Sequence, residues 1–189
     1  KGVQQERTIS DTFEQTMSGE TLVDMENLDM IVGSGGVLSH APRREQACRM
    51  LIDSFLPEGI TQLAVDSIFM MPQLGVLSTF HEQAAIEVFH KDCLIKLGTC
   101  LAPIGQSTLN KPLLKYSFDI NDEIHEGCLK FGDIILIKAD LGSHKCTINP
   151  ERNIDIGFGK GQNFEGTING GEVGIILDGR GREIQFLDD

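Results

Sequence analysis

The sequence lacks any apolar run that approaches the roughly 20 residues a helix needs to span a bilayer. It is also poor in positive charge: 16 lysine and arginine residues stand against 28 aspartate and glutamate residues, so the formal net charge is −12. Duplex nucleic acid and anionic membranes repel such a surface, and we therefore expect neither as a partner. The simplest use of this acidity is solubility.

Several motifs of metal sites and enzymes are missing as well. The five cysteines form no C-x-x-C pair, the five histidines form no H-E-x-x-H, and there is no G-x-S-x-G elbow. No zinc site or thioredoxin-like site is indicated, and we assign no metal ligand and no catalytic residue to the chain. Five irregularly spaced cysteines suit the reducing cytosol, so a cytoplasmic location is expected.

What the chain does have is enough apolar material for an ordinary core. It has 189 residues, of which 40% are hydrophobic, and this length fits one large domain or two small ones. Because it begins with Lys1 and not with Met, we expect that processing or truncation made this end. Apolar residues at near-helical spacing predict a helix over 5–18, which Gly19 would end.

Between residues 28 and 102, apolar runs alternate with helical patterns. In chain order we predict a strand at 28–32, a helix at 43–55, a strand at 63–65, a helical region from 70 to 91 and a strand at 93–102. Strands that alternate with helices imply a parallel or mixed α/β sheet.

The helix over 43–55 has clear boundary signals. Pro42 suits its first turn, and Pro57-Glu58-Gly59 would break the chain after it. Its buried face is expected to carry Ala47, Met50, Leu51 and Phe55.

The character of the sequence changes near Pro103. Glycine becomes frequent, and short β-type runs lie at 134–137, 146–148 and 173–177. This spacing predicts a small β-rich barrel or sandwich. The expected organisation is thus an α/β part over 1–102 followed by a β-rich module over 103–189.

The best candidate for a binding site is the run Gly33-Ser34-Gly35-Gly36, which lies between an expected buried strand and a helix. Glycine lets a backbone approach a ligand closely, and the start of a helix offers free amide donors to a nucleotide. The run does not complete G-x-G-x-x-G, because Leu38 stands at the last position. A tight strand-to-helix crossover without a ligand is the alternative.

Asp66 is the second candidate, since it ends a predicted strand. Ligands of open α/β sheets lie outside the carboxyl ends of the strands, so Asp66 could hydrogen-bond a ribose or a base edge. The alternative is that it caps the next helix.

Two glycine-rich segments in the second half invite other interpretations. Residues 155–161 resemble a phosphate-binding loop, but Gly161 stands where serine or threonine should hold magnesium, so a glycine-rich hairpin is favoured. Residues 178–182 read as a hairpin turn, whose Arg180 and Arg182 could contact carboxylates of a partner.

The segment Met30 to Pro42, MIVGSGGVLSHAP, resembles the adenosine motif of the actin, heat-shock ATPase and sugar-kinase superfamily. In that motif a strand ends in glycines that cradle adenine and ribose, and a helix opened by proline follows. Residues 66–75 resemble the closing segment of the superfamily, where a helix packs behind the nucleotide.

The resemblance is closer still to the glutamate mutase L family, and it extends over nearly the whole chain. The segments that carry it are 30–44, 56–61, 63–78 and 170–182. Members of that family are accessory factors of adenosylcobalamin-dependent carbon-skeleton mutases and aminomutases, and they are unrelated to the mismatch-repair protein with a similar short name. Their inferred role is the ATP-driven reactivation of a mutase that holds damaged cobalamin.

This resemblance implies that the chain is the C-terminal part of an actin-like nucleotide-binding lobe plus a β-rich module. It implies ATP or ADP with magnesium as the ligand of the full-length protein, and glutamate mutase or an aminomutase as the partner. The adenosine-side residues it implies are Gly33, Ser34, Gly35, Gly36 and Asp66.

The sequence departs from the superfamily in one respect. The Asp-x-Gly hairpins that hold magnesium and phosphates belong to an N-terminal lobe, whereas the one Asp-x-Gly here is at 155–157. A D-x-H-x-x-G cobalamin signature is also missing, so we expect no cobalamin binding by this chain. Two alternative functions are a fragment of a hydantoinase- or oxoprolinase-type enzyme and a nucleotide-independent interaction module.

Overall fold

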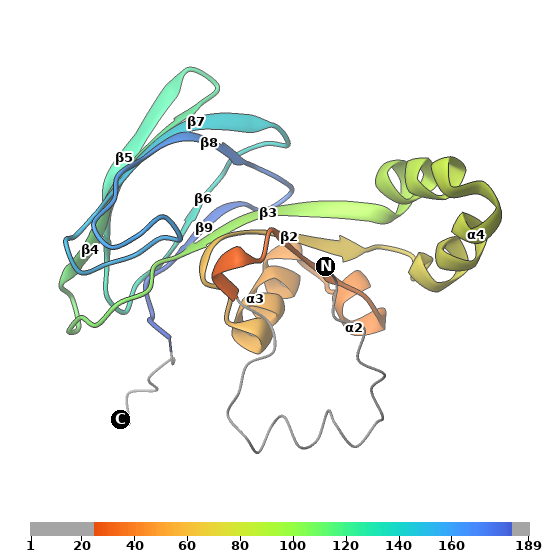
Figure 1. Cartoon of the computed structure of the whole chain (residues 1–189), viewed down its shortest axis with the longest axis horizontal. Helices are drawn as coiled ribbons and strands as arrows, with labels where there is room; N and C mark the ends of the chain where they lie inside the picture. The colour runs from red at the N-terminus through yellow and green to blue at the C-terminus, as the bar shows by residue number, and fades with distance from the viewer. Residues whose placement is uncertain (1–24, 183–189) are drawn as a thin grey trace, which may run out of the picture.

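The computed structural model describes residues 25–182, so the helix expected over 5–18 lies outside the described residues. The first half contains a short 3₁₀ turn η1 (Met25–Asn27), β1 (Met30–Gly33), α2 (Gly36–Ser39), α3 (Arg44–Phe55), β2 (Gly59–Asp66), α4 (Met71–Val88), a π-helical turn η2 (Phe89–Cys93) and β3 (Leu94–Ala102). The second half contains β4 (Pro112–Ile120), β5 (Glu123–Lys130), β6 (Ile134–Ile137), β7 (Ser143–Pro150), β8 (Phe164–Asn169) and β9 (Gly174–Asp178) (Figure 1).

The larger sheet has five strands in the order β1-β2-β3-β9-β6. Strand β1 is parallel to β2, and β3 is parallel to β9, whereas the β2–β3 and β6–β9 pairs are antiparallel. The expected mixed α/β sheet is therefore confirmed. Between β2 and β3 the chain forms α4 and η2, which lie on the right of Figure 1. The chain leaves the sheet along the first half of α4 and returns along its second half, so β3 runs antiparallel to β2.

The second sheet has four antiparallel strands in the order β5-β4-β7-β8. Its buried residues, which include Leu114, Phe118 and Ile148, share one core cluster with residues of the larger sheet. The part after residue 103 is thus rich in strands as expected, and its four-stranded sheet packs on the larger sheet.

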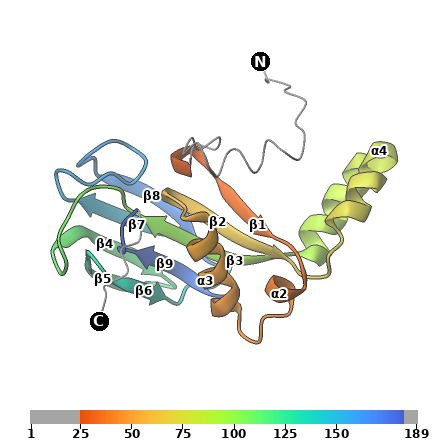
Figure 2. The same cartoon turned by 90° about the horizontal axis from the view of Figure 1, so that it is seen from below.

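Strand β9 shows how the layers are stacked. Ile175 and Leu177 belong to the core cluster between the two sheets, whereas Ile176 belongs to the cluster beneath α3. Successive strand residues point to opposite faces, so the larger sheet is covered by the smaller sheet on one face and by α3 on the other (Figure 2). Since β6 and β9 complete the larger sheet, that sheet takes strands from both sides of residue 103, and the predicted two-part organisation stays a prediction.

Helix α3 differs in detail from its prediction. Its buried residues are Ala47, Cys48, Leu51 and Ile52. The prediction was wrong for Phe55, which is 53% exposed at the last position of the helix. Leu56 has φ 47° and turns the chain away directly after Phe55, so this last side chain of the helix lies beyond the buried face.

The start of α3 also differs. Pro42 lies before the helix rather than in its first turn, because Arg43 is extended and acts as the N-terminal cap residue. The amide of Arg43 donates to Oε1 of Gln46 at 3.2 Å, which satisfies a donor that the helix start would otherwise leave free.

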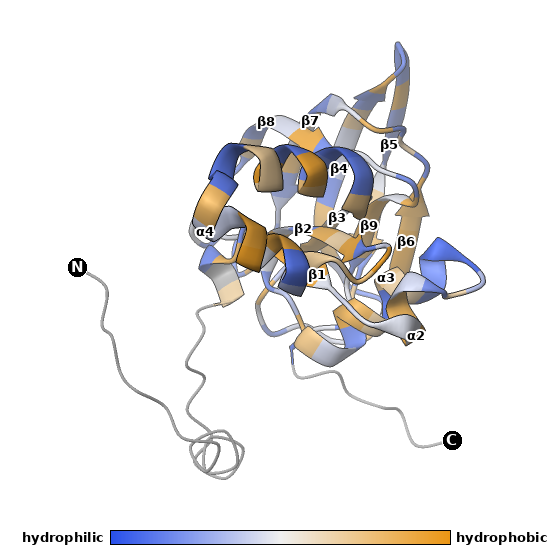
Figure 3. Cartoon of the chain, turned by 90° about the vertical axis from the view of Figure 1, so that its right-hand side faces the viewer, coloured by the Kyte–Doolittle hydropathy of each residue, from blue (hydrophilic) through white to orange (hydrophobic). Residues whose placement is uncertain are grey.

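Helix α4 stands away from both sheets (Figure 1). It is kinked at His81, whose φ and ψ are −143° and 71°, and its two halves enclose a small cluster of Leu74, Ala85 and Cys93. Other apolar side chains of the helix remain exposed outside that cluster, among them Val76 and Phe80. Figure 3 shows that apolar and polar stretches alternate along α4. Among the described residues, none of the helices is long and apolar enough to cross a membrane.

Strand β9 can join the sheet only because two glycines meet where it begins. Gly98 has φ 140° and pairs with Gly174, which has φ 115°. A Cβ atom at Gly98 would collide with the backbone oxygen of Gly174. This close approach requires glycine at position 98.

We therefore expect Gly98→Ala to destabilise the fold by about 3 kcal/mol, through backbone strain and overpacking together. In a chain of this size that lowers the melting temperature by about 10 °C, which circular dichroism would measure. Gly75→Ala is the matched control, because Gly75 lies inside α4 with open space around it and alanine favours a helix. Equal melting temperatures for Gly98→Ala and the wild type would contradict this account of the junction.

Candidate functional site

The parallel pairing of β1 and β2 brings the two predicted site segments together. Gly33, the last residue of β1, lies opposite Val65, so Ser34, which follows β1, lies beside Asp66, the last residue of β2, at the carboxyl ends of these strands. The Ser34 hydroxyl donates to Oδ2 of Asp66 at 3.4 Å. This edge is where open α/β sheets bind their ligands.

The three glycines of the run do different things. A Cβ atom at Gly33 would lie 2.6 Å from Leu38 Cδ1 and 2.8 Å from Leu51 Cδ2, so glycine is needed there for packing. Gly35 has φ 111°, and neither it nor Gly36 would bring a Cβ atom within 4 Å of any other atom. The backbone over Gly35 and Gly36 is therefore open to an approaching molecule.

Asp66 is fully buried, and its carboxylate is occupied by groups of this chain. Besides the Ser34 hydroxyl, Oδ2 accepts from the amide of Met71 at 3.0 Å and Oδ1 from that of Ile68 at 3.4 Å. Met71 is the first residue of α4, so the alternative of a helix cap is realised. A contact between Asp66 and a ligand stays a prediction.

These hydrogen bonds also set the charge state of Asp66. Burial alone would raise the pKa of its carboxyl, but hydrogen bonds from the amides of Met71, Met70 and Ile68 and from the Ser34 hydroxyl lower that pKa below its ordinary value. Asp66 is therefore an anion at neutral pH, and it joins the glycine run to the start of α4.

A second set of contacts holds the far end of the glycine loop. The buried Ser39 hydroxyl donates to the backbone oxygen of Asp66 at 2.5 Å, and Arg44 Nη1 donates to the backbone oxygen of Ser39 at 3.0 Å. Sequence reasoning missed both residues. The available signal was a serine shortly after the glycines and an arginine in the first turn of the next helix.

Next to the loop lies a groove of about 610 Å³, within the size range of small-molecule sites. It follows the chain from Val37 into the first turns of α3. Its lining residues are Val37, Ala41, Pro42, Glu45, Gln46, Arg49 and Met50. The groove combines apolar side chains with a few polar groups, which is the usual composition of small-molecule sites. The residues present thus fit the adenosine part of a nucleotide.

The segment 155–161 is not a phosphate loop in this structure. Oδ1 of Asp155 accepts hydrogen bonds from the amides of Gly157, Phe158 and Gly159, at 2.9, 3.2 and 2.9 Å. A carboxylate of the chain thus occupies the donors that a phosphate would need. The segment leads into strand β8 rather than a helix, in agreement with the rejection of the phosphate-loop interpretation.

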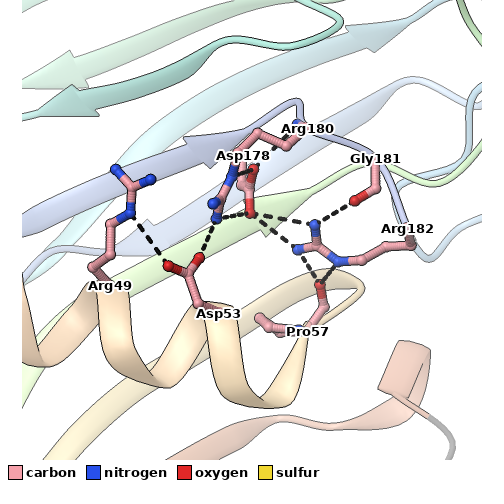
Figure 4. Close-up of polar contacts among 7 residues, drawn as sticks. All are labelled: Arg49, Asp53, Pro57, Asp178, Arg180, Gly181 and Arg182. Atoms are coloured by element: carbon pink, nitrogen blue, oxygen red, sulfur yellow. Dashed lines mark hydrogen bonds and ion pairs between the residues drawn. The ribbon is translucent and has the colours of Figure 1, made fainter. Parts of the chain in front are cut away.

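The idea that Arg180 and Arg182 contact a partner's carboxylates is wrong for this structure. Arg180 pairs with Oδ1 of the fully buried Asp178 at 2.8 Å and with Oδ1 of Asp53 at 2.7 Å. Arg182 lies 3.3 Å from Oδ2 of Asp178 and donates to the backbone oxygen of Pro57 (Figure 4). A buried carboxylate needs such partners, so both cations serve the chain itself.

The described residues, 25–182, contain no group of three or more histidine, cysteine, aspartate or glutamate side chains that could hold a metal ion.

The comparisons with known proteins give one match. Residues 3–93, just under half of the chain, match the family model described as MutL protein. This segment includes the glycine run, α3, Asp66 and α4. Neither the curated proteins nor the solved structures contain a match to the chain.

The contacts of Asp66 lead to a prediction for stability. Asp66→Asn should cost about 2 kcal/mol at pH 7, because amide and hydroxyl donors lose a buried anionic acceptor. The pKa of Asp66 is lower in the folded than in the unfolded state, so its contribution is complete above the unfolded value of about 3.9. The contribution is lost as pH falls through the lower, folded value.

Urea unfolding of the wild type and of Asp66→Asn at pH 7 and at pH 3 measures this difference. The difference in the free energy of unfolding between the two proteins should be smaller at pH 3 than at pH 7. Asp29→Asn is the control, since Asp29 is exposed. An equal difference in stability at both pH values, or no difference at pH 7, would refute the stabilising role of the Asp66 carboxylate.

Proposed function

We propose that the chain is part of an ATP-dependent factor that reactivates an adenosylcobalamin-dependent mutase, because residues 3–93 match the family model described as MutL protein and the sequence resembles the glutamate mutase L family. In this proposal Gly33, Ser34, Gly35 and Gly36 receive the adenosine side of the nucleotide. The partner is a mutase, either glutamate mutase or an aminomutase. The chain forms the C-terminal part of an actin-like lobe together with a β-rich module.

One observation carries the nucleotide part of the proposal. The backbone of Gly35 and Gly36 is open where the parallel strands β1 and β2 end, and the groove of suitable size begins at Val37. A close approach of backbone to a ligand is a main reason for glycine at such an edge.

Each site residue then has a separate task. Gly35 and Gly36 leave room for the sugar, and the apolar side chains at Val37, Ala41 and Pro42 receive the base. Buried Asp66 acts as a positioning residue: it holds Ser34 through one carboxylate oxygen and Ser39 through its backbone oxygen. The loop is thus ordered before a ligand arrives, which reduces the entropy lost on binding.

In the whole factor, ATP supplies binding energy that favours one arrangement of the lobes over another. A ligand can shift such an equilibrium only by the difference in its affinity for the two arrangements. The role of this chain is to bind and orient the adenosine part.

Isothermal titration calorimetry of the 189-residue chain with ADP tests the binding step. Gly36→Asp should abolish binding without disturbing the fold, because a side chain at Gly36 enters only the open space over the loop. Gly75→Asp is the matched control: this glycine also has open surroundings but lies on α4, and its variant should bind as the wild type does.

A comparison of ligands sharpens the test. If the chain supplies the adenosine side alone, adenosine and ADP should bind with similar affinity. Binding that Gly36→Asp leaves unchanged would contradict the assignment of the loop. If neither ligand binds the wild type, the nucleotide proposal fails and the interaction module becomes the better description.

A further inference from the structure

Helix α3 touches both the candidate loop and the last strand of the larger sheet. Its Leu51 fills the space beside Gly33, where a Cβ atom would lie only 2.8 Å from Leu51 Cδ2. The same buried face packs against Val173, which directly precedes β9, and against Ile176 within β9. One rigid element is therefore shared by the two regions.

At the beginning of α3, Arg44 joins the same two regions through polar contacts. Its Nη1 donates to the backbone oxygen of Ser39, whose hydroxyl is bonded to Asp66. Its Nε lies 3.3 Å from Oε2 of Glu172, two residues before β9. A single guanidinium thus bridges the end of the glycine loop and the approach to β9.

At the other end of α3, three charged residues connect the helix to the end of β9. We call Asp53, Asp178 and Arg180 the α3 latch. Arg180 bridges the carboxylates of Asp178 and Asp53, at 2.8 and 2.7 Å (Figure 4). Arg182 adds two hydrogen bonds to the backbone oxygen of Pro57, at 2.9 and 2.6 Å.

The latch differs from the exposed ion pair that Glu45 of α3 makes with Lys138 of the second half of the chain. Arg180 is only 14% exposed and Asp178 is fully buried, so solvent screens these two charges little, although Asp53 is 41% exposed. Glu45 and Lys138, by contrast, are 46% and 69% exposed, and pairs of this kind contribute little. The Glu45–Lys138 pair is therefore a natural control for the latch.

We propose that α3 couples the glycine loop to the end of β9, so that loosening the helix at either end loosens the contacts at the other. Interiors are densely packed, and a displacement of α3 at the latch moves Leu51 and Arg44 with it. Such coupling is reciprocal: whatever stabilises the loop stabilises the latch by the same free energy. As a means of regulating nucleotide binding, the coupling rests on the proposed function.

Amide hydrogen exchange of the full chain tests the coupling without any ligand. Asp53→Asn removes one charge of the latch but leaves the buried Asp178 paired with Arg180 and Arg182. We expect the amides of Ser39 and His40, which donate to Gly35 and Gly36, to exchange about fivefold faster in this variant. Lys138→Gln, which removes the exposed pair with Glu45, should leave their exchange unchanged.

The reciprocal variant is Arg44→Gln. It should accelerate exchange of the Gly179 amide, which donates to the backbone oxygen of Asp133 beside the latch. The amide of Phe118 in β4 reports global opening. The proposal is overturned if Asp53→Asn changes exchange only near the latch, or if Phe118 accelerates by the same factor as Ser39.

An ADP titration separates this inference from the proposed function. In the wild type, bound ADP should slow exchange at Ser39 and also at Gly179, and Asp53→Asn should remove only the second effect. Protection of Ser39 alone in the wild type would overturn the coupling while it supports nucleotide binding. If ADP does not bind, the proposed function fails, and the ligand-free exchange decides the coupling by itself.

Discussion

The parallel pairing of β1 with β2 is the constraint on which the candidate site depends. Residues that are more than 30 positions apart in the chain become neighbours because Gly33 pairs with Val65. The glycine run and Asp66 then leave the sheet at one edge. A carboxylate buried at this edge is stable only if it is hydrogen-bonded, and Ser34, Ile68 and Met71 provide the donors. The same anion therefore shapes the loop and caps α4.

The second half of the chain contributes two strands, β9 and β6, to the larger sheet that carries the candidate site. Strand β9 pairs with β3, and its alternate residues face α3 and the smaller sheet. Helix α3 covers one face of the larger sheet and meets charged residues of the second half at both ends. The family match ends at residue 93, but the core beneath the matched helix contains Val173 and Ile176. The matched segment and the second half thus share a hydrophobic core.

Much of the local structure could be predicted from the sequence, because apolar periodicity and glycine or proline breaks are local signals. The strands before Gly33 and Asp66, the helix after Arg43 and the strand that ends at Ala102 are all present. The position of β9 between β3 and β6 could not be predicted. It depends on a pairing between residues some 75 positions apart in the chain. It also requires glycine at positions 98 and 174, and this requirement becomes visible only once the two strands are known to be neighbours.

The candidate site was predictable in part. The residue types at 33–36 and at Asp66 suggested a ligand edge, and the structure places them together. The sequence did not reveal that Gly33 serves packing while Gly35 and Gly36 face open space, because this depends on where Leu38 and Leu51 lie. The partners of Arg180 were equally hidden: Asp53 is 127 positions earlier, and only the fold brings its carboxylate to the guanidinium.

The most direct test of the account is an amide chemical-shift titration of the isotopically labelled chain with adenosine. The account predicts that the largest shifts occur at Gly35, Gly36 and Val37 and extend along the groove to Met50, while residues 155–161 do not respond. Shifts that gather at residues 155–161, or that leave Gly35 and Gly36 unchanged, would contradict it.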